Sequence, residues 1–113
     1  MFTINGVEFE FNILNARTAD AWEKAFAELD EVGKQPAAKG LAAEIRRQTA
    51  AVHKLLDAIL GEGSYEATCL DPDDLNANMD AVEALIAEGN RQKDATGKRW
   101  SKYAPNRAQR RAT

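Results

Sequence analysis

A hairpin signal at the N-terminus constrains the fold more than any other feature of the chain. The first eleven residues alternate polar and apolar side chains around Asn5-Gly6, the pair that best tolerates the positive φ angles of a type I′ turn. The predicted apolar face consists of Phe2 opposite Phe9, Ile4 opposite Val7, and Phe11. Because a lone two-stranded hairpin is marginal in water, we expect this face to pack on helices of the same chain or on a partner.

Three stretches of helical periodicity follow the hairpin. The first helix is predicted from Thr18, as N-cap, to Val32, and the second runs to a stop at Gly61. The third starts in the acidic turn around Pro72 and fades near Asp94. Their apolar stripes are Trp22, Phe26 and Leu29, then Leu41, Ile45, Val52, Leu55, Leu56, Ile59 and Leu60, then Leu75, Met79, Val82, Leu85 and Ile86. Residues 61–70 are predicted as a loop.

These signals predict a mainly α fold with an N-terminal β-hairpin, about three helices and a flexible basic C-terminal tail. A chain of 113 residues suits one domain, which we place at residues 1–96 with the hairpin at 1–11. The pair Thr96-Gly97 interrupts the helical pattern, and no clear amphipathic period follows it. Residues 97–113 are therefore predicted to form a separate basic tail.

The charge of the chain is divided between its two ends. From Arg91 onward there are eight Lys and Arg residues and one acid, Asp94, which gives +7, whereas residues 1–90 carry −10. The single cysteine and the lack of a leader at Met1 indicate the cytoplasm. No apolar run approaches the ~18 residues of a membrane span, so we expect no membrane partner.

Residue types that carry chemistry are sparse. His53 is the only histidine and Cys69 the only cysteine, which is too few for a usual zinc site, and Gly61 and Gly63 lack the lysine of a phosphate-binding loop. We interpret His53 as a border residue of the second helix and Cys69 as a partly buried loop residue. The acids near Pro72 lack the pattern of a calcium loop. We therefore expect no catalytic, cofactor or metal site, and no enzyme.

Trp100 and Tyr103 lie among cations and allow two interpretations. They could stack on bases while Lys and Arg track phosphates, as in single-strand binding. Alternatively, this basic segment docks on an acidic protein surface, which includes this protein's own helices. We favour docking, because a short run of cations is not specific for nucleic acid and the rest of the chain is acidic.

Both ends resemble proteins of phage tail-gene regions. The opening Thr3-Ile4-Asn5-Gly6-Val7-Glu8-Phe9-Glu10-Phe11 resembles the "T-I-N-G-x-x-[YF]-x-[FL]" start of tail assembly chaperones from long-tailed bacteriophages. The ending Asn106-Arg107-Ala108-Gln109-Arg110-Arg111 is similar to the "N-R-x-Q-R-R" endings of small phage and prophage tail-region proteins. The resemblance covers the hairpin and the tail, whereas the helices match only in general character.

The resemblance implies a viral protein in the cytoplasm of the bacterial host, which binds the tape measure protein and helps to recruit tail tube protein. The alternatives are a structural virion component, such as a tail or head-completion protein, and a nucleic-acid-binding accessory protein. The two-ended charge also predicts self-association between copies. The predicted partner-binding residues are Phe2, Ile4, Val7, Phe9, Phe11, Trp100, Tyr103, Arg107, Arg110 and Arg111.

Overall fold

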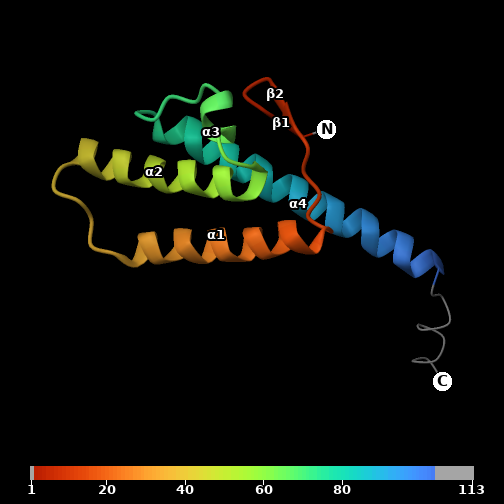
Figure 1. Ribbon diagram of the computed structural model, residues 1–113. Coiled ribbons are helices and arrows are strands. Elements are labelled where there is room, and N and C mark those ends of the chain that lie inside the picture. Colours follow the sequence, from red (N-terminus) through yellow and green to blue (C-terminus); the bar gives the residue numbers. More distant parts are fainter. Residues whose placement is uncertain (1, 104–113) are drawn as a thin grey trace.

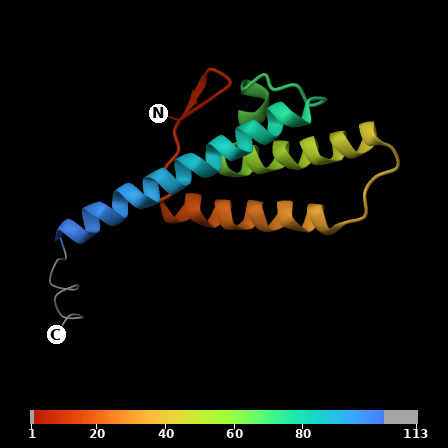
Figure 2. The ribbon, with the colours of Figure 1, turned by 180° about the vertical axis from the view of Figure 1, so that it is seen from behind.

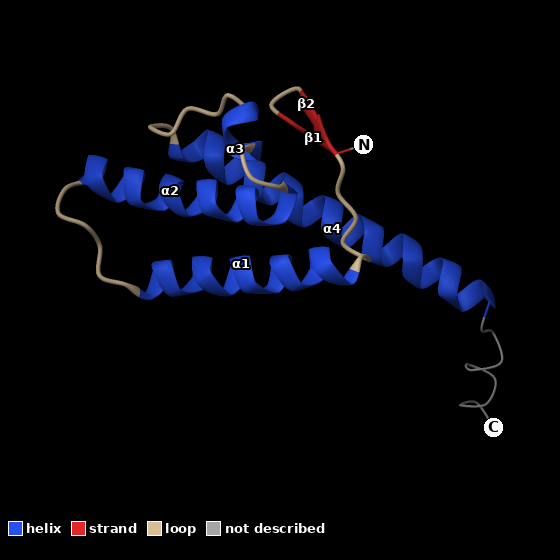
Figure 3. Cartoon of the chain, in the orientation of Figure 1, coloured by secondary structure: helices blue, strands red, loops and turns tan. Residues whose placement is uncertain are grey.

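The described part of the chain folds into three long helices, one short helix and an N-terminal hairpin, arranged as an elongated body (Figure 1). A computed structural model describes residues 2–103. The elements are β1 (Phe2–Ile4), β2 (Val7–Phe9), α1 (Ala16–Lys34), α2 (Leu41–Leu60), α3 (Ser64–Ala67) and α4 (Leu75–Tyr103). Figure 3 shows that helices dominate and that the two strands form the only sheet drawn. The predicted fold class, a hairpin followed by helices, is confirmed.

The hairpin has the predicted register. Phe2 pairs with Phe9 and Ile4 with Val7, and Asn5 and the following glycine have φ angles of 50° and 80°, as a type I′ turn requires. The Asn5 side-chain amide also donates a hydrogen bond of 2.6 Å to the carbonyl of Thr68. Strand β1 packs on α4. The hairpin therefore packs within its own chain, one of the two arrangements that its sequence allows.

Helix α1 starts before the predicted position, because Asn15 and not Thr18 is its N-cap. The Asn15 Oδ1 atom accepts hydrogen bonds from the amides of Arg17 and Thr18 at 3.0 and 3.4 Å, which satisfies two amides that lack partners within the helix. At its other end the helix continues past Val32 to Lys34. The N-cap therefore lies three residues before the predicted one, and the helix ends two residues after its predicted end.

Helix α2 lies between α1 and α4 and carries most of the core. Its side chains Leu55 and Leu56 are almost fully buried, as is Leu85 of α4. It ends at Gly61 as predicted, with a φ angle of 114° that favours glycine. The core consists of Phe2, Ile4, Ala25, Val52, Leu55, Leu56, Ile59, Tyr65, Ala81 and Leu85. The apolar stripes of three helices therefore meet on α2.

The segment predicted as a loop between the second and third long helices contains α3. Within it, Tyr65 is buried and its hydroxyl donates a 2.6 Å hydrogen bond to Oδ1 of Asn78 in α4. Helix α4 starts at Leu75, where Asp74 accepts a hydrogen bond from the Ala77 amide through its side chain. The acid at the helix start is thus Asp74, and Pro72 precedes the helix.

Helix α4 extends past the predicted end of the third long helix. It runs without a break through Asp94 and the Thr96-Gly97 pair to Tyr103, so residues 97–103, which were predicted as part of the basic tail, are helical. A single glycine costs a helix about 1 kcal/mol, which the neighbouring turns of α4 tolerate. The predicted sites Arg107, Arg110 and Arg111 lie outside the described residues.

Candidate functional site

An apolar groove lies between α1 and α4, with α2 as its floor. Figures 1 and 2 show α1 and α2 side by side, with α4 crossing them and continuing beyond. Helices α1 and α4 meet where Trp22 covers Gly89, and a hollow of about 440 Å³ opens between them near the start of α4. We call it the α1/α2/α4 groove.

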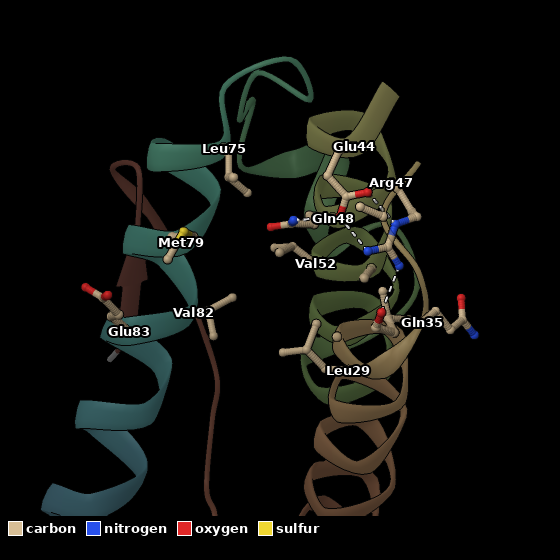
Figure 4. A pocket seen from close by; sticks show the side chains of 14 residues that line it. Leu29, Gln35, Glu44, Arg47, Gln48, Val52, Leu75, Met79, Val82 and Glu83 are labelled. Carbon is tan, nitrogen blue, oxygen red and sulfur yellow. Dashed lines mark hydrogen bonds and ion pairs between the residues drawn. The ribbon is translucent and has the colours of Figure 1, made fainter. Parts of the chain in front are cut away.

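The groove is lined mainly by apolar side chains from three helices. In Figure 4, Leu75 and Val82 of α4 point toward Val52 of α2 and Leu29 of α1. Met79 lies on the same wall of α4, and its side chain is 46% exposed. A large apolar side chain that stays half-exposed beside a hollow is typical of a surface that a partner covers. The groove is therefore the strongest candidate binding site on the described chain.

Polar groups at one end of the groove hold its shape. The carboxylate of Glu44 pairs with the guanidinium of Arg47 and accepts a 2.7 Å hydrogen bond from the Ala38 amide. Arg47 also donates a 2.8 Å hydrogen bond to the carbonyl of Val32, near the C-terminus of α1. Gln48 adds a further hydrogen bond to Glu44. This network ties the end of α1 and the following loop to α2, so the distance between the two helices is fixed there.

The same contacts keep Glu44 charged. Hydrogen bonds from Arg47, Gln48 and the Ala38 amide lower the pKa of Glu44 to about 2, and the pairing raises the pKa of Arg47. Neither group is poised to exchange a proton near neutral pH, as a general acid or base would be. The network therefore acts as a structural clamp on the groove.

A second candidate surface is the end of α4 that extends past the body, which we call the α4 overhang (residues 94–103). Almost all of its residues are exposed, and Trp100 and Tyr103 are 62% and 81% exposed. Both aromatics continue, at spacings of three and four residues, the inward stripe that includes Gly89 and Thr96. In the first half of α4 this face of the helix packs on the body. In the second half the same face is exposed among the residues that the structure describes.

The structure places the predicted hairpin residues largely inside the molecule. Phe2 and Ile4 are buried, so no partner can reach these two side chains unless the core opens. Val7, Phe9 and Phe11 are half-buried. Phe11 stacks on Trp22 at 5.8 Å between ring centroids, and Gln92 of α4 donates a hydrogen bond to the Phe11 carbonyl. Phe9 and Phe11 line a hollow together with Arg91 and Gln92 of α4, whereas the exposed aromatics Trp100 and Tyr103 follow further along that helix.

His53 and Cys69 lie apart from the groove. The His53 ring stacks on Tyr65 at 4.5 Å, and its Nε2 atom lies 3.1 Å from a carboxylate oxygen of Asp57. Cys69 is exposed, with a φ angle of 56°, which corrects its predicted partial burial. Residues 2–103 contain no group of His, Cys, Asp and Glu side chains that could hold a metal ion. None of the helices described is long and apolar enough to cross a membrane.

Sequence reasoning missed the groove because it requires the relative placement of three helices. Its residues Leu29, Val52 and Val82 belong to the predicted stripes, and periodicity alone assigns such residues to a core. Met79 and Ile86 were a usable sequence signal for the groove, and in the structure their side chains are 46% and 37% exposed. They widen the apolar stripe of α4 beyond what one neighbouring helix covers.

The fold and this site define a small helical protein with an N-terminal hairpin and an open apolar groove. The chain belongs to the family of unknown function DUF6673, whose model matches residues 5–113. No curated protein and no solved structure matches the chain.

Proposed function

We propose that this protein is a phage tail assembly chaperone, which binds a helical segment of the tape measure protein in the α1/α2/α4 groove. The observation that carries the proposal is the groove itself, an apolar hollow with three helices around it and a half-exposed Met79 on its wall. Helix-in-groove recognition places the apolar face of an amphipathic helix into a hollow of this kind. A client helix there would complete a four-helix arrangement.

The shape of the groove favours a helical client. Its α4 wall, from Leu75 to Val82, covers two helical turns, about 12 Å long at 1.5 Å per residue. Methionine is unbranched and adapts its shape to different partners, which suits a chaperone that meets several segments of one long client. The clamp between Glu44 and Arg47 keeps the groove open before the client arrives, which lowers the ordering cost of binding.

The resemblance at the hairpin supports the same function from a different part of the chain. The Thr3-Ile4-Asn5-Gly6 start, which resembles tail assembly chaperones, forms the tight turn of the hairpin. The hairpin packs on α4, the helix that also provides one wall of the groove. On this proposal the hairpin supports the binding helix, and its buried residues Phe2 and Ile4 contribute stability and not direct contacts.

A structural virion component is the main competing function, and the composition of the particle separates the two. A chaperone leaves after assembly, so mass spectrometry of purified phage particles is expected to lack the protein, whereas affinity purification from infected or induced cells is expected to recover it with the tape measure protein. Stoichiometric presence in finished particles would contradict the chaperone proposal. Recovery of nucleic acid without the tape measure protein would indicate the accessory function instead.

A further inference from the structure

The α4 overhang carries an aromatic face that no other part of residues 2–103 covers. Trp100 and Tyr103 lie in phase with Gly89, which the body buries under Trp22. Lys98, Arg99 and Lys102 occupy the rest of the same two turns. The overhang is therefore a short amphipathic helix, apolar on one face and cationic on the others, which is the shape of a helix that docks in a groove.

The α1/α2/α4 groove has complementary properties. Its α4 wall covers about 12 Å, and the segment from Thr96 to Tyr103 also covers about 12 Å. Glu83 lies at the rim of the groove, with its carboxylate on the outer side of α4 (Figure 4). Residues 1–90 carry a net charge of −10 against the +7 from Arg91 onward. An acidic body attracts a cationic helix and orients its approach.

The overhang cannot reach the groove of its own chain. Both lie on the single continuous helix α4, and residues 82 and 96 are about 21 Å apart along its axis. Figures 1 and 2 show the overhang leaving the body at the end opposite the start of α4. Docking within one molecule would require α4 to break and fold back, so the occupant must come from another molecule.

We infer that the overhang of one copy docks in the α1/α2/α4 groove of a second copy, which gives a head-to-tail assembly. The pair then keeps one free groove, on the first copy, and one free overhang, on the second, so the contact is heterologous and repeats along a chain or closes into a ring. Trp100 and Tyr103 are the apolar anchors, because aromatic residues most often dominate such contacts. The inference is independent of the proposed client, since it concerns the protein alone.

If the proposed function holds as well, the two occupants compete. A second copy would cover the apolar groove while no client is present, and a tape measure helix would displace it. This keeps a half-exposed Met79 out of water in the free protein. Self-association measured without any client tests the inference, and client binding measured with an overhang variant tests the function separately.

The test uses two defective variants of the full chain. Trp100→Ala with Tyr103→Ala removes the anchors of the overhang, and Met79→Lys places a cation in the groove. All three residues are substantially exposed, so both variants are expected to fold, which circular dichroism checks. Ser101→Ala on the overhang and Ala87→Lys on the outer face of α4 are the matched controls, since both positions are exposed.

Sedimentation velocity at low ionic strength measures the assemblies over a range of concentrations. Wild type and the controls are expected to form concentration-dependent oligomers, and each defective variant is expected to weaken association at least about tenfold. Raising the salt concentration should weaken wild-type association, because exposed charges are screened. Glu83→Lys provides a second groove variant at another exposed position.

Mixing the two defective variants gives the decisive result. The intact groove of the overhang variant and the intact overhang of the groove variant form one contact, so the mixture is expected to give 1:1 dimers and nothing larger. A wild-type protein that stays monomeric at all concentrations would overturn the inference. Oligomers that survive either variant, or a mixture that remains monomeric, would overturn it too.

Discussion

The indole ring of Trp22 in α1 lies directly over Gly89 in α4, so closely that a Cβ atom at position 89 would be 2.8 Å from Cη2 of the ring. The side-chain Nζ atom of Lys93, one turn further along α4, lies 5.7 Å from the centre of the same ring. This contact joins α1 to α4 at the end opposite the groove. The contact between Trp22 and Gly89 therefore fixes the point from which α1 and α4 separate toward the groove.

Gly89→Ala is expected to destabilise the protein although alanine favours helix. The helix gains about 1 kcal/mol from the replacement, but crowding against a packed ring costs about 1–3 kcal/mol. We expect a net loss of about 0–2 kcal/mol in the free energy of unfolding, measured with urea, whereas the control without the crowding is expected to gain stability. Gly97→Ala in the same helix is the control, because nothing lies within 4 Å of its added Cβ. A Gly89→Ala variant as stable as the control would contradict the contact.

Tyr65→Phe tests the buried hydrogen bond between α3 and α4. Asn78 is fully buried, and its side-chain amide already donates to the carbonyls of Asp71 and Asp74. Loss of the Tyr65 hydroxyl leaves the Asn78 Oδ1 atom without its donor, which is expected to cost about 1–3 kcal/mol in the free energy of unfolding. Tyr103→Phe, at an exposed position, is expected to change it by less than about 0.5 kcal/mol. Equal effects of the two substitutions would contradict a buried bond.

Tyr65 also predicts a loss of stability in alkali. Burial is the main cause that raises the pKa of Tyr65, and the carboxylate of Asp71 adds to it. Because the pKa of Tyr65 is raised in the folded state, the neutral phenol contributes its full stability below the pKa of an unfolded tyrosine, about 10. This stability is lost as the pH rises through the pKa of the folded protein. Urea unfolding between pH 9 and 11, compared with Tyr65→Phe, measures the difference. If the free energies of unfolding of wild type and Tyr65→Phe changed in parallel with pH, the Tyr65 phenol would make no such contribution.

Two carboxylates that are paired with arginine, those of Glu44 and Glu88, are expected to affect how the free energy of unfolding changes at acid pH. Hydrogen bonds from Arg47 lower the pKa of Glu44, and hydrogen bonds from Arg91 lower that of Glu88, each to about 2. A lowered pKa contributes stability above the ordinary value near 4.5 and loses it as the pH falls toward 2. The variant Glu44→Gln with Glu88→Gln is therefore expected to lose less stability than wild type between pH 5 and 2.

Thermal unfolding over that pH range measures the effect, and Glu83→Gln on the exposed wall of the groove is the control. We expect the control to follow the wild-type curve. If the variant with Glu44→Gln and Glu88→Gln also followed the wild-type curve, the two carboxylates would make no contribution to the pH dependence of stability. Hydrogen exchange at the Ala38 amide, which donates to Glu44, reports on the first clamp alone and is expected to become faster in Glu44→Gln.

The parts of this fold that depend on neighbouring residues could be predicted from the sequence. The register of Phe2 with Phe9 followed from Asn5-Gly6, because a two-residue turn fixes the pairing of its strands. The second role of Asn5, a hydrogen bond to Thr68 sixty-three residues away, could not be predicted. Helix α3 was missed for the same reason, since a four-residue helix carries no period and depends on the distant contact between Tyr65 and Asn78.

The end of α4 shows how a local breaker can mislead. Thr96-Gly97 suggested a boundary, and no clear period was found after it, yet in the structure Trp100 and Tyr103 continue the spacing of the buried stripe of α4. The groove was beyond sequence reasoning, because Leu29 and Val82 meet across it only after three helices have packed. The charge division, in contrast, needs no structure and led to the expectation that copies associate.

The measurement that tests the central claim most directly is co-purification of the tape measure protein with groove variants. Tagged wild type, Met79→Lys and the control Ala87→Lys are each produced together with the tape measure protein encoded in the same phage or prophage. Wild type and Ala87→Lys are expected to retain the client, while Met79→Lys, with a charge in the groove, loses most of it. If wild type retains no client, or Met79→Lys retains as much as the control, the groove is not a chaperone site for this client.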